Sequence, residues 1–519
     1  MSMLKNFATV GVATLSSRVL GFVRDILIAA SLGSGPIADA FFVAFRLPNL
    51  FRRLFAEGAF NSAFVPIFAG SLEDQGKDGA RRVAEEIMAG LLLVLLIFTA
   101  LAELAMPLMI HLLAPGFTED PSKFDLAVVL TRITFPYLIC MSLIAFLSGI
   151  LNSLGKFAAA AFAPVLLNVV LIATLMLVLF VGADNSPLAG YYLAWGVFLA
   201  GFVQLAALVW ALLHAKFPLS FRKPANTANV KKLLKLGVPG IIAGGVTQLN
   251  ITIGTIIASF QAGAVSYLYY ADRVYQLPLG VVGIAIGVVL LPDLARKVRA
   301  EDKTAVDNAQ NRAMEFAMFL TLPAAVALAV VPEQIIAVLF QRGQFSTDDT
   351  HMTALALSAF AFGLPAFVLN KVLSPGFFAR HDTQTPMKFA AIAMIINVIG
   401  SLALFPYISH MGIAVATTIA GWINALLLGV TLWRRGHFRA DGLLMRRLAM
   451  FLLSSLVMGA GVWWLGQLLA PWFEDSLLLT RITGLVLLVG AGIALFLIAS
   501  LGTGAISFSE LKRRLRRRA

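Results

Sequence analysis

The chain has 519 residues, of which 59% are hydrophobic and only 13% are charged. This balance excludes an ordinary soluble domain, in which about 25% of the residues are charged. The formal net charge of +13 would suggest a nucleic-acid partner for a soluble protein. Here the basic residues lie in short gaps between long apolar runs, as in the cytoplasmic loops of membrane proteins. We therefore predict an all-α polytopic membrane protein that does not bind nucleic acid.

The sequence has no pattern typical of a disulfide framework, a metal site or covalent catalysis. Its single cysteine, Cys140, lies in an apolar run. The first ten residues lack a cleavage site of the signal-peptide type, so we expect them to be retained. A Walker loop, an HExxH motif and a GxSxG context are all missing. We therefore expect a transporter without cofactors or metals, driven by an ion or voltage gradient, and not an enzyme.

Apolar runs predict fourteen transmembrane helices. Each run is near or above the length of about 20 residues that crosses the hydrocarbon core. In chain order, the helices are expected at 7–32, 36–68, 83–112, 126–151, 158–182, 189–213, 234–260, 265–294, 313–340, 352–379, 387–407, 411–433, 446–470 and 479–501.

Loop charge predicts the orientation of these helices. Basic residues concentrate in alternate gaps, at 77–82, 156, 214–235, 296–303, 380–388 and 434–447, and in the tail at 512–518. The other gaps hold few basic residues and lie at 33–36, 115–125, 182–187, 261–265, 341–350, 409–410 and 471–476. The positive-inside rule places the basic set, and with it both termini, in the cytoplasm.

Weak internal similarity predicts a duplicated core. An Ala-Asp pair followed by a Leu-Pro pair occurs at 38–48 and again at 271–278, and further motifs recur in the same order. We expect two six-helix lobes related by a pseudo-two-fold axis, with sites at their interface. The predicted parts are an N-terminal lobe at 1–213, a cytoplasmic linker at 214–235, a C-terminal lobe at 236–433, a cytoplasmic loop at 434–445, an additional helix pair at 446–503 and a basic cytoplasmic tail at 504–519.

Charged side chains lie inside the first two predicted helices. Arg18 and Arg24 fall in the first, and Arg52 follows Asp39 in the second. An unpaired charge in hydrocarbon costs at least about 2.5–3.5 kcal/mol on insertion scales, so we expect these groups to face a watered cavity. Arginine suits phosphate because its planar fork donates two parallel hydrogen bonds. With Arg273 from the second lobe, these residues predict a cationic cavity for a pyrophosphate.

Local geometry refines this prediction. Gly21 can bend the first helix so that Arg18 and Arg24 face the same side. Pro48 should kink the second helix and redirect Arg52 inward. Asp25 and Asp39 are expected to orient some arginines when the site is empty. The secondary candidates for the cavity are Asp25, Arg46, Asn49, Arg53, Ser266 and Asp272.

The alternative interpretation is that these charges form structural ion pairs or lie at membrane ends, and Arg53 fits that best. Several amides also lie at membrane depth, where interhelical hydrogen bonding is a commoner role than binding a coupling cation. They are Asn168, Asn250, Asn370, Asn397 and Asn424. Glu85 and Glu86 are expected at a cytoplasmic helix start, where negative charge complements the helix dipole.

Two long motifs carry a resemblance to a known family. They read SRVLGFVRD at 17–25 and DAFFVAFRLPNLFRRLFAEGAF at 39–60. Shorter ones are FVP at 64–66, APGF at 114–117, YYADR at 269–273, LLP at 290–292 and LSPGFFAR at 373–380. Together they resemble the MurJ (MviN) lipid II flippases of the multidrug/oligosaccharidyl-lipid/polysaccharide exporter superfamily, over essentially the whole chain.

The resemblance implies an activity and a location. Members move lipid II, an undecaprenyl-pyrophosphate with a disaccharide-peptide, to the outer leaflet of the bacterial cytoplasmic membrane for peptidoglycan synthesis. It implies that the essential cavity residues are Arg18, Arg24, Arg52, Arg273 and Asp39, and that the last two helices hold the polyprenyl tail. Gln276 stands where some members carry a charge, so no role is carried over to it. The sodium site of some members needs an aspartate that the helix at about 236–260 lacks, so that site is not carried over.

Other functions remain open at this point. An exporter of another polyprenyl-pyrophosphate glycan, such as an O-antigen unit, would have a similar cavity. A drug antiporter would need an anionic cavity instead. A non-transporting scaffold of envelope synthesis would tolerate neutral residues in place of the cavity arginines. We expect a monomer that contacts lipid II and, at its cytoplasmic face, anionic membrane lipids.

Overall fold

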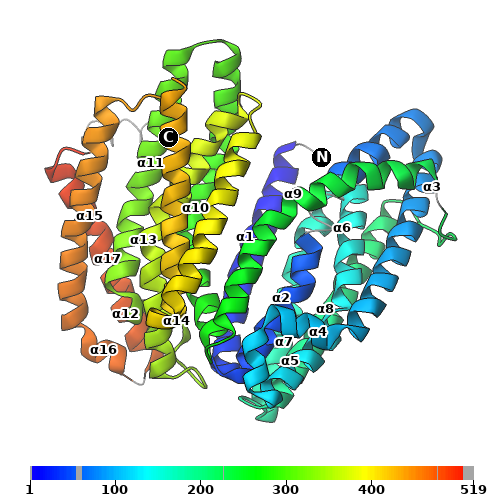
Figure 1. Cartoon of the computed structure of the whole chain (residues 1–519), viewed down its shortest axis with the longest axis horizontal. Helices are drawn as coiled ribbons and strands as arrows, with labels where there is room; N and C mark the ends of the chain where they lie inside the picture. The colour runs from blue at the N-terminus through cyan, green and yellow to red at the C-terminus, as the bar shows by residue number, and fades with distance from the viewer. Residues whose placement is uncertain (1–2, 54–60, 226, 476, 506–519) are drawn as a thin grey trace. The chain divides into compact units, whose positions relative to one another are not determined.

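The structure, a computed structural model, describes residues 3–53, 61–225, 227–475 and 477–505 (Figure 1). Within these ranges the regular secondary structure is helical, without a strand. The basic tail beyond residue 505 and residues 54–60 of the second motif lie outside the described residues. The prediction of an all-α fold is confirmed.

Nine helices in the described part of the chain are long and apolar enough to cross a membrane. One of them, α14 (Gln384–Arg434), has 51 residues and leaves helical geometry at Ile408 and Ser409. It therefore covers both predicted spans at 387–407 and 411–433. The membrane class is confirmed by these helices, whereas the count of fourteen stays a prediction.

The chain forms two compact units, and unit 1 comprises Met1–Ser266 and Arg342–Phe345. Helix α1 packs on α7, α7 packs on α8, and α2 packs on α5. The elements of unit 1 are α1 (Met3–Leu32), α2 (Pro36–Arg52), α3 (Asn61–Leu104), α4 (Met106–Leu113), the 3-10 helix η2 (Pro115–Glu119), α5 (Pro121–Thr134), α6 (Tyr137–Ser153), α7 (Phe157–Val181), α8 (Pro187–His214), α9 (Ala228–Ala258) and the first residues of α10 (Ala264–Arg299).

Unit 2 comprises Tyr267–Gln341 and Ser346–Ala519. Here α13 packs between α11 and α14, while α15 packs against α11 and α17. Figure 1 shows α15 and α17, in orange and red, beside α11. The elements that follow α10 are α11 (Lys303–Val330), α12 (Pro332–Phe340), α13 (Thr347–Phe378), α14, α15 (Gly442–Leu468), α16 (Ala470–Glu474) and α17 (Leu478–Gly502).

Several predicted spans have different boundaries in the structure. The predicted span at 36–68 covers α2, which ends at Arg52, and the start of α3 at Asn61, and its middle part lies outside the described residues. The span at 126–151 is divided between α5 and α6 at Pro136. The span at 313–340 is divided between α11 and α12, because α11 ends before Pro332. Proline lacks the N–H that would continue a helix, and it begins a new one readily.

The compact units do not divide at the predicted linker. Helix α9 follows that linker, but it packs on α3 and α4 and belongs to unit 1. The predicted lobes rest on a sequence repeat, which packing does not test. The lobe boundaries therefore stay a prediction.

Residues in or near gaps that the charge pattern assigns to one side contact each other within unit 1. The Gly116 N–H donates to Ser259 Oγ at 3.0 Å, and the Asn185 N–H donates to the Ser31 carbonyl at 2.8 Å. From the basic set, the Ser220 N–H donates to Glu85 Oε1 at 2.9 Å. This grouping is what two opposite membrane sides require. The orientation of the termini stays a prediction.

Candidate functional site

Arg24 is a buried and paired cation in unit 1, with 4% of its surface exposed. Its Nη2 lies 2.7 Å from Asp25 Oδ1, and its Nη1 donates to Asn168 Oδ1 on α7 at 3.0 Å. The guanidinium also lies 5.8 Å from the centre of the Phe45 ring on α2. Because three elements fix it, Arg24 is oriented before any ligand arrives. The expectation that Asp25 orients an arginine is confirmed.

Gly21 allows α7 to approach α1. Asn168 Nδ2 donates to the Ser17 carbonyl at 2.9 Å, and a Cβ added at Gly21 would lie 3.5 Å from that nitrogen. A methyl group at residue 21 would therefore be in ordinary van der Waals contact with the amide. Helix α1 runs unbroken from Met3 to Leu32, and the expected bend at Gly21 stays a prediction.

Arg18 differs from Arg24 in having no partner. It is exposed, and it makes no hydrogen bond or ion pair with any residue that the structure describes. It lies near the middle of α1, whose 30 residues extend over about 45 Å. A bare guanidinium at that depth requires water or an anionic ligand.

Helix α2 continues through Pro48 because α5 replaces the missing hydrogen bond. Proline at 48 cannot donate to the Ala44 carbonyl, and Thr134 Oγ1 donates to that oxygen at 3.0 Å instead. Asn49 Nδ2 donates to the Phe45 carbonyl at 2.7 Å. Helix α2 thus continues to Arg52 without a break at Pro48, and the expected kink there stays a prediction.

The remaining cations of α2 lie in different surroundings. Arg52 is half-buried, and its Nε donates to Asn49 Oδ1 at 3.3 Å. Arg46 is half-buried as well and donates to Thr255 Oγ1 on α9. Arg53 is exposed at the end of the helix, which fits its interpretation as an anchor.

Asp39 has a lysine partner where an arginine was expected. Its side chain is 0% exposed, and Oδ2 lies 2.7 Å from Lys123 Nζ and accepts the Gly263 N–H at 2.9 Å. Oδ1 accepts the backbone N–H and the hydroxyl of Ser266 at 3.0 and 2.7 Å. The carboxylate therefore caps the start of α10 and neutralises Lys123, and it orients no arginine in this state.

Unit 2 carries the predicted Arg273 on α10. Its Nη2 and Nε lie 3.0 and 3.3 Å from the Tyr269 hydroxyl, which accepts their hydrogen bonds, and its guanidinium lies 5.1 Å from the centre of that ring. Asp272 accepts a hydrogen bond from Gln276. The neutral Gln276 thus keeps a local contact to the neighbouring carboxylate.

Sequence reasoning missed Lys371, which lies at membrane depth in α13. It is exposed, and a Cβ added at Gly283 of α10 would lie 2.5 Å from its Nζ. A scan for every charge inside apolar runs would have found it. Lys123 was missed as a partner of Asp39 because the two are 84 positions apart.

The interhelical role expected of the amides is confirmed for three of them. Besides Asn168, Asn370 Nδ2 donates to the Gly421 carbonyl at 3.3 Å, and Asn397 Oδ1 accepts from Thr417 Oγ1 at 3.1 Å. In the described part of the chain, no group of three His, Cys, Asp or Glu side chains is arranged to hold a metal ion.

Glu85 has a different role from the one expected. It lies inside α3, well past the non-helical Gly76, and Oε2 accepts from Arg222 Nε at 2.5 Å. Glu86 accepts from Asn229 Nδ2 at 3.2 Å. These glutamates therefore fix the 214–235 segment to α3 and do not mark a helix start.

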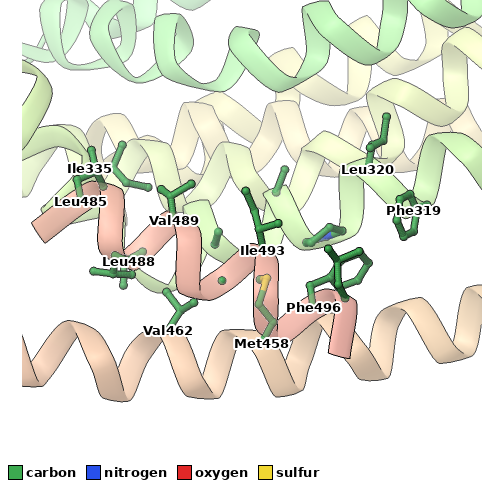
Figure 2. A pocket seen from close by; sticks show the side chains of 16 residues that line it. Phe319, Leu320, Ile335, Met458, Val462, Leu485, Leu488, Val489, Ile493 and Phe496 are labelled. Atoms are coloured by element: carbon green, nitrogen blue, oxygen red, sulfur yellow. The ribbon is translucent and has the colours of Figure 1, made fainter. Parts of the chain in front are cut away.

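An apolar cavity of about 450 Å³ opens in unit 2. Figure 2 shows the side chains around it, which come from α11, α12, α15 and α17. Those labelled include Phe319, Ile335, Met458, Val489 and Ile493. A cavity with this lining suits a hydrocarbon chain and offers nothing to a charged group.

Beyond the membrane helices, a basic cluster surrounds His437. Burial, with help from Arg380, Arg435 and Lys303, lowers the pKa of His437. Hydrogen bonds from Thr385, with a further one from Arg435, lower the pKa of Asp382 to about 2. Both shifts describe a surface with more positive than negative charge.

Comparisons with known proteins agree over the whole chain. The family model described as lipid II flippase MurJ matches residues 28–483. A probable lipid II flippase MurJ from Rhizobium tropici is 50% identical over 520 residues, which cover 100% of this chain and 97% of that protein. The relative from Rhizobium meliloti (strain 1021) is 51% identical over 521 residues, with 100% and 97% covered.

Solved structures agree as well. One described as lipid II flippase MurJ in an inward closed conformation has a TM-score of 0.78 and 26% identity, covering 95% of this chain and 98% of that one. An inward-facing multidrug resistance transporter of the MATE family has a TM-score of 0.65 at 16% identity, covering 81% and 94%, and shows the shared fold alone. From the family model and its full-length relatives, the chain belongs to the MurJ family of lipid II flippases.

Proposed function

We propose that this protein moves lipid II from the inner to the outer leaflet of the bacterial cytoplasmic membrane. The observation that carries the proposal is Arg18, an exposed guanidinium that makes no hydrogen bond or ion pair with the described residues and lies near the middle of α1, which the sequence predicts to span the membrane. Such a charge is tolerated in a watered cavity, where it can bind an anion. The pyrophosphate of lipid II supplies that anion.

The arginines have different roles in binding the pyrophosphate. Arg18 meets the pyrophosphate directly, because no protein group that the structure describes neutralises it. Arg24 is held by Asp25 and Asn168, so it offers a fixed donor at little ordering cost. Arg52 and Arg273 complete the cationic set as the cavity closes around the head group. Bidentate hydrogen bonds from several guanidinium groups match the oxygens of a pyrophosphate.

The polyprenyl tail occupies the cavity between α11, α12, α15 and α17. Its lining is almost wholly apolar, and its volume of about 450 Å³ accommodates part of a long isoprenoid chain. The tail thereby stays out of water while the head group crosses.

Alternating access moves the head group through the membrane. Net charge transfer makes the cycle sensitive to membrane potential, worth about 2.3 kcal/mol per charge per 100 mV. The membrane potential or an ion gradient therefore drives the cycle. The protein works as a monomer with both termini in the cytoplasm, where its basic loops contact anionic lipids.

The test is lipid II exposure on cells depleted of this protein. An enzyme added from outside cleaves only outward-facing lipid II. Cleavage should collapse on depletion and return with the wild type, but not with Arg18→Ala. The matched control is Arg82→Ala, which removes an exposed arginine of the basic set and should restore cleavage.

Two results would contradict the proposal. Normal cleavage in depleted cells that carry no other flippase would show that lipid II crosses without this protein and favour another lipid-linked glycan as its substrate. Full rescue by Arg18→Ala would remove the cationic cavity from the mechanism and favour a scaffold.

A further inference from the structure

One tight turn of the chain belongs to a different unit from the helices that flank it. Residues Arg342–Phe345 lie in unit 1, whereas α12 before them and α13 after them lie in unit 2. The Phe345 N–H donates to the Arg342 carbonyl at 3.1 Å, which closes the turn. Helix α13 then starts at once, with a capping box between Ser346 and Asp349.

This turn is seated on the end of α1 and on the loop between α7 and α8. The Gln344 N–H donates to the Ala30 carbonyl at 2.9 Å, and Gln344 Nε2 donates to Asp184 Oδ2 at 2.7 Å. Next to this contact, the Asn185 N–H donates to the carbonyl of Ser31. The turn therefore bridges two loops of unit 1 by backbone and side-chain hydrogen bonds.

The seat has no room for a Cβ on either side. Gly343 has a φ of +56°, and a Cβ there would lie 2.3 Å from the Ala30 carbonyl oxygen. Gly33 has a φ of +63°, and a Cβ there would lie 2.5 Å from the Gln344 carbonyl oxygen. The two glycines thus allow the backbone of the turn and the backbone at the end of α1 to come into close contact.

The base of the turn is fixed within unit 2. Arg481 of α17 donates through Nη1 to the Gln341 carbonyl at 3.2 Å, and Gln341 Nε2 donates to Thr347 Oγ1 at 3.0 Å. The turn is therefore held at its base within unit 2, and its tip is held by the hydrogen bonds of Gln344 and by further contacts of Arg342 and Phe345.

We propose that Arg342–Phe345 is a latch, seated on unit 1 in this state, that must leave its seat in each transport cycle. The proposal rests on the alternating access of the proposed function and adds a turn whose release the cycle requires. Release uncovers the end of α1 around Ala30 and Ser31, next to the gap at 33–36 that the charge pattern assigns to the outer side.

The first test follows burial at the seat. Ser31 is fully buried and its hydroxyl has no partner in the described structure, so Ser31→Cys is a mild reporter, made in a Cys140→Ser background. A water-soluble maleimide is added to the full-length protein in lipid nanodiscs. Gly343→Ala should raise the labelling rate about five- to tenfold, because the turn can no longer seat and loses at least one hydrogen bond.

The matched control is Gly182→Ala. Gly182 has a φ of +67°, so alanine meets the same backbone strain there, but no atom lies within 4 Å of its Cβ. This variant should label at the parent rate. Equal labelling of the Gly343→Ala and Gly182→Ala proteins would overturn the latch.

The second test locks the seat without disturbing the glycines. Asp184→Cys and Gln344→Cys are joined by a short bis-thiosulfonate, which replaces their 2.7 Å hydrogen bond with a covalent link. Lipid II exposure should be lost on cross-linking and return with a reductant, while each single-cysteine protein keeps its activity after the same treatment. Normal exposure with the cross-link formed would refute the latch.

The two proposals fail in different ways. If the double-cysteine protein supports lipid II exposure both before and after cross-linking, the flippase function stands and the latch is wrong. If depletion leaves lipid II exposure intact, the flippase function fails, and nanodisc labelling still reports whether the turn leaves its seat.

Discussion

The buried ion pair between Asp39 and Lys123 gives the sharpest prediction about stability. Replacing Lys123 with Met keeps the length and apolar body of the side chain and removes its charge. The Asp39 carboxylate then remains fully buried with the donors of Gly263 and Ser266, but without its cation. A buried carboxylate cannot reach water in this state.

Removing one partner of a buried pair costs about 3–5 kcal/mol. Three hydrogen bonds to Asp39 survive in the Lys123→Met protein, so we expect the lower end, about 3 kcal/mol. Asp39→Asn should cost a similar amount, since an amide N–H then faces other donors. The double variant should lose less than the sum of both, with a coupling energy of about 2 kcal/mol.

The assay is reversible unfolding of the purified protein in mixed detergent micelles, followed by tryptophan fluorescence. Lys77→Met is the matched control, because Lys77 is exposed and has no partner among the described residues. It should change stability by less than about 0.5 kcal/mol. Equal unfolding free energies for the Lys123→Met and Lys77→Met proteins would refute the buried pair.

Three further predictions concern other contacts. Asn168→Ala should lower the free energy of unfolding by about 1.5–3 kcal/mol, the range of a hydrogen bond to a charged group. It should also lower transport, because Arg24 loses a positioning partner. Unchanged transport and stability would contradict this. Glu85→Gln weakens the hold of α3 on Arg222, so limited proteolysis should cut the 214–235 segment faster than in the wild type; equal cleavage would disprove the attachment. His437 resists protonation in the folded protein, so stability should fall as pH drops through its ordinary pKa of 6.5, and His437→Gln should flatten that slope between about pH 7 and 5 in thermal unfolding; parallel pH profiles would refute it.

The sequence by itself determined the class of the protein and the identity of its charged residues at membrane depth. Long apolar runs require helices, because a chain in lipid must satisfy its own backbone groups. Two motifs, at 17–25 and 39–60, indicated the family. Arg18 and Arg24 could be identified as candidates because a charge in an apolar run has a high free-energy cost.

Only the tertiary structure decided how each of these charges is used. Proline at 48 predicts a break by local rules, yet Thr134 on α5 supplies the missing hydrogen bond. Asp39 pairs with Lys123 on α5, and Asn168 on α7 fixes Arg24. Local sequence encodes which groups must be satisfied, whereas the partners come from helices distant in the chain. The close backbone contact of the 342–345 turn with the end of α1 likewise needs glycine at both 33 and 343. No local sequence pattern relates these two distant positions.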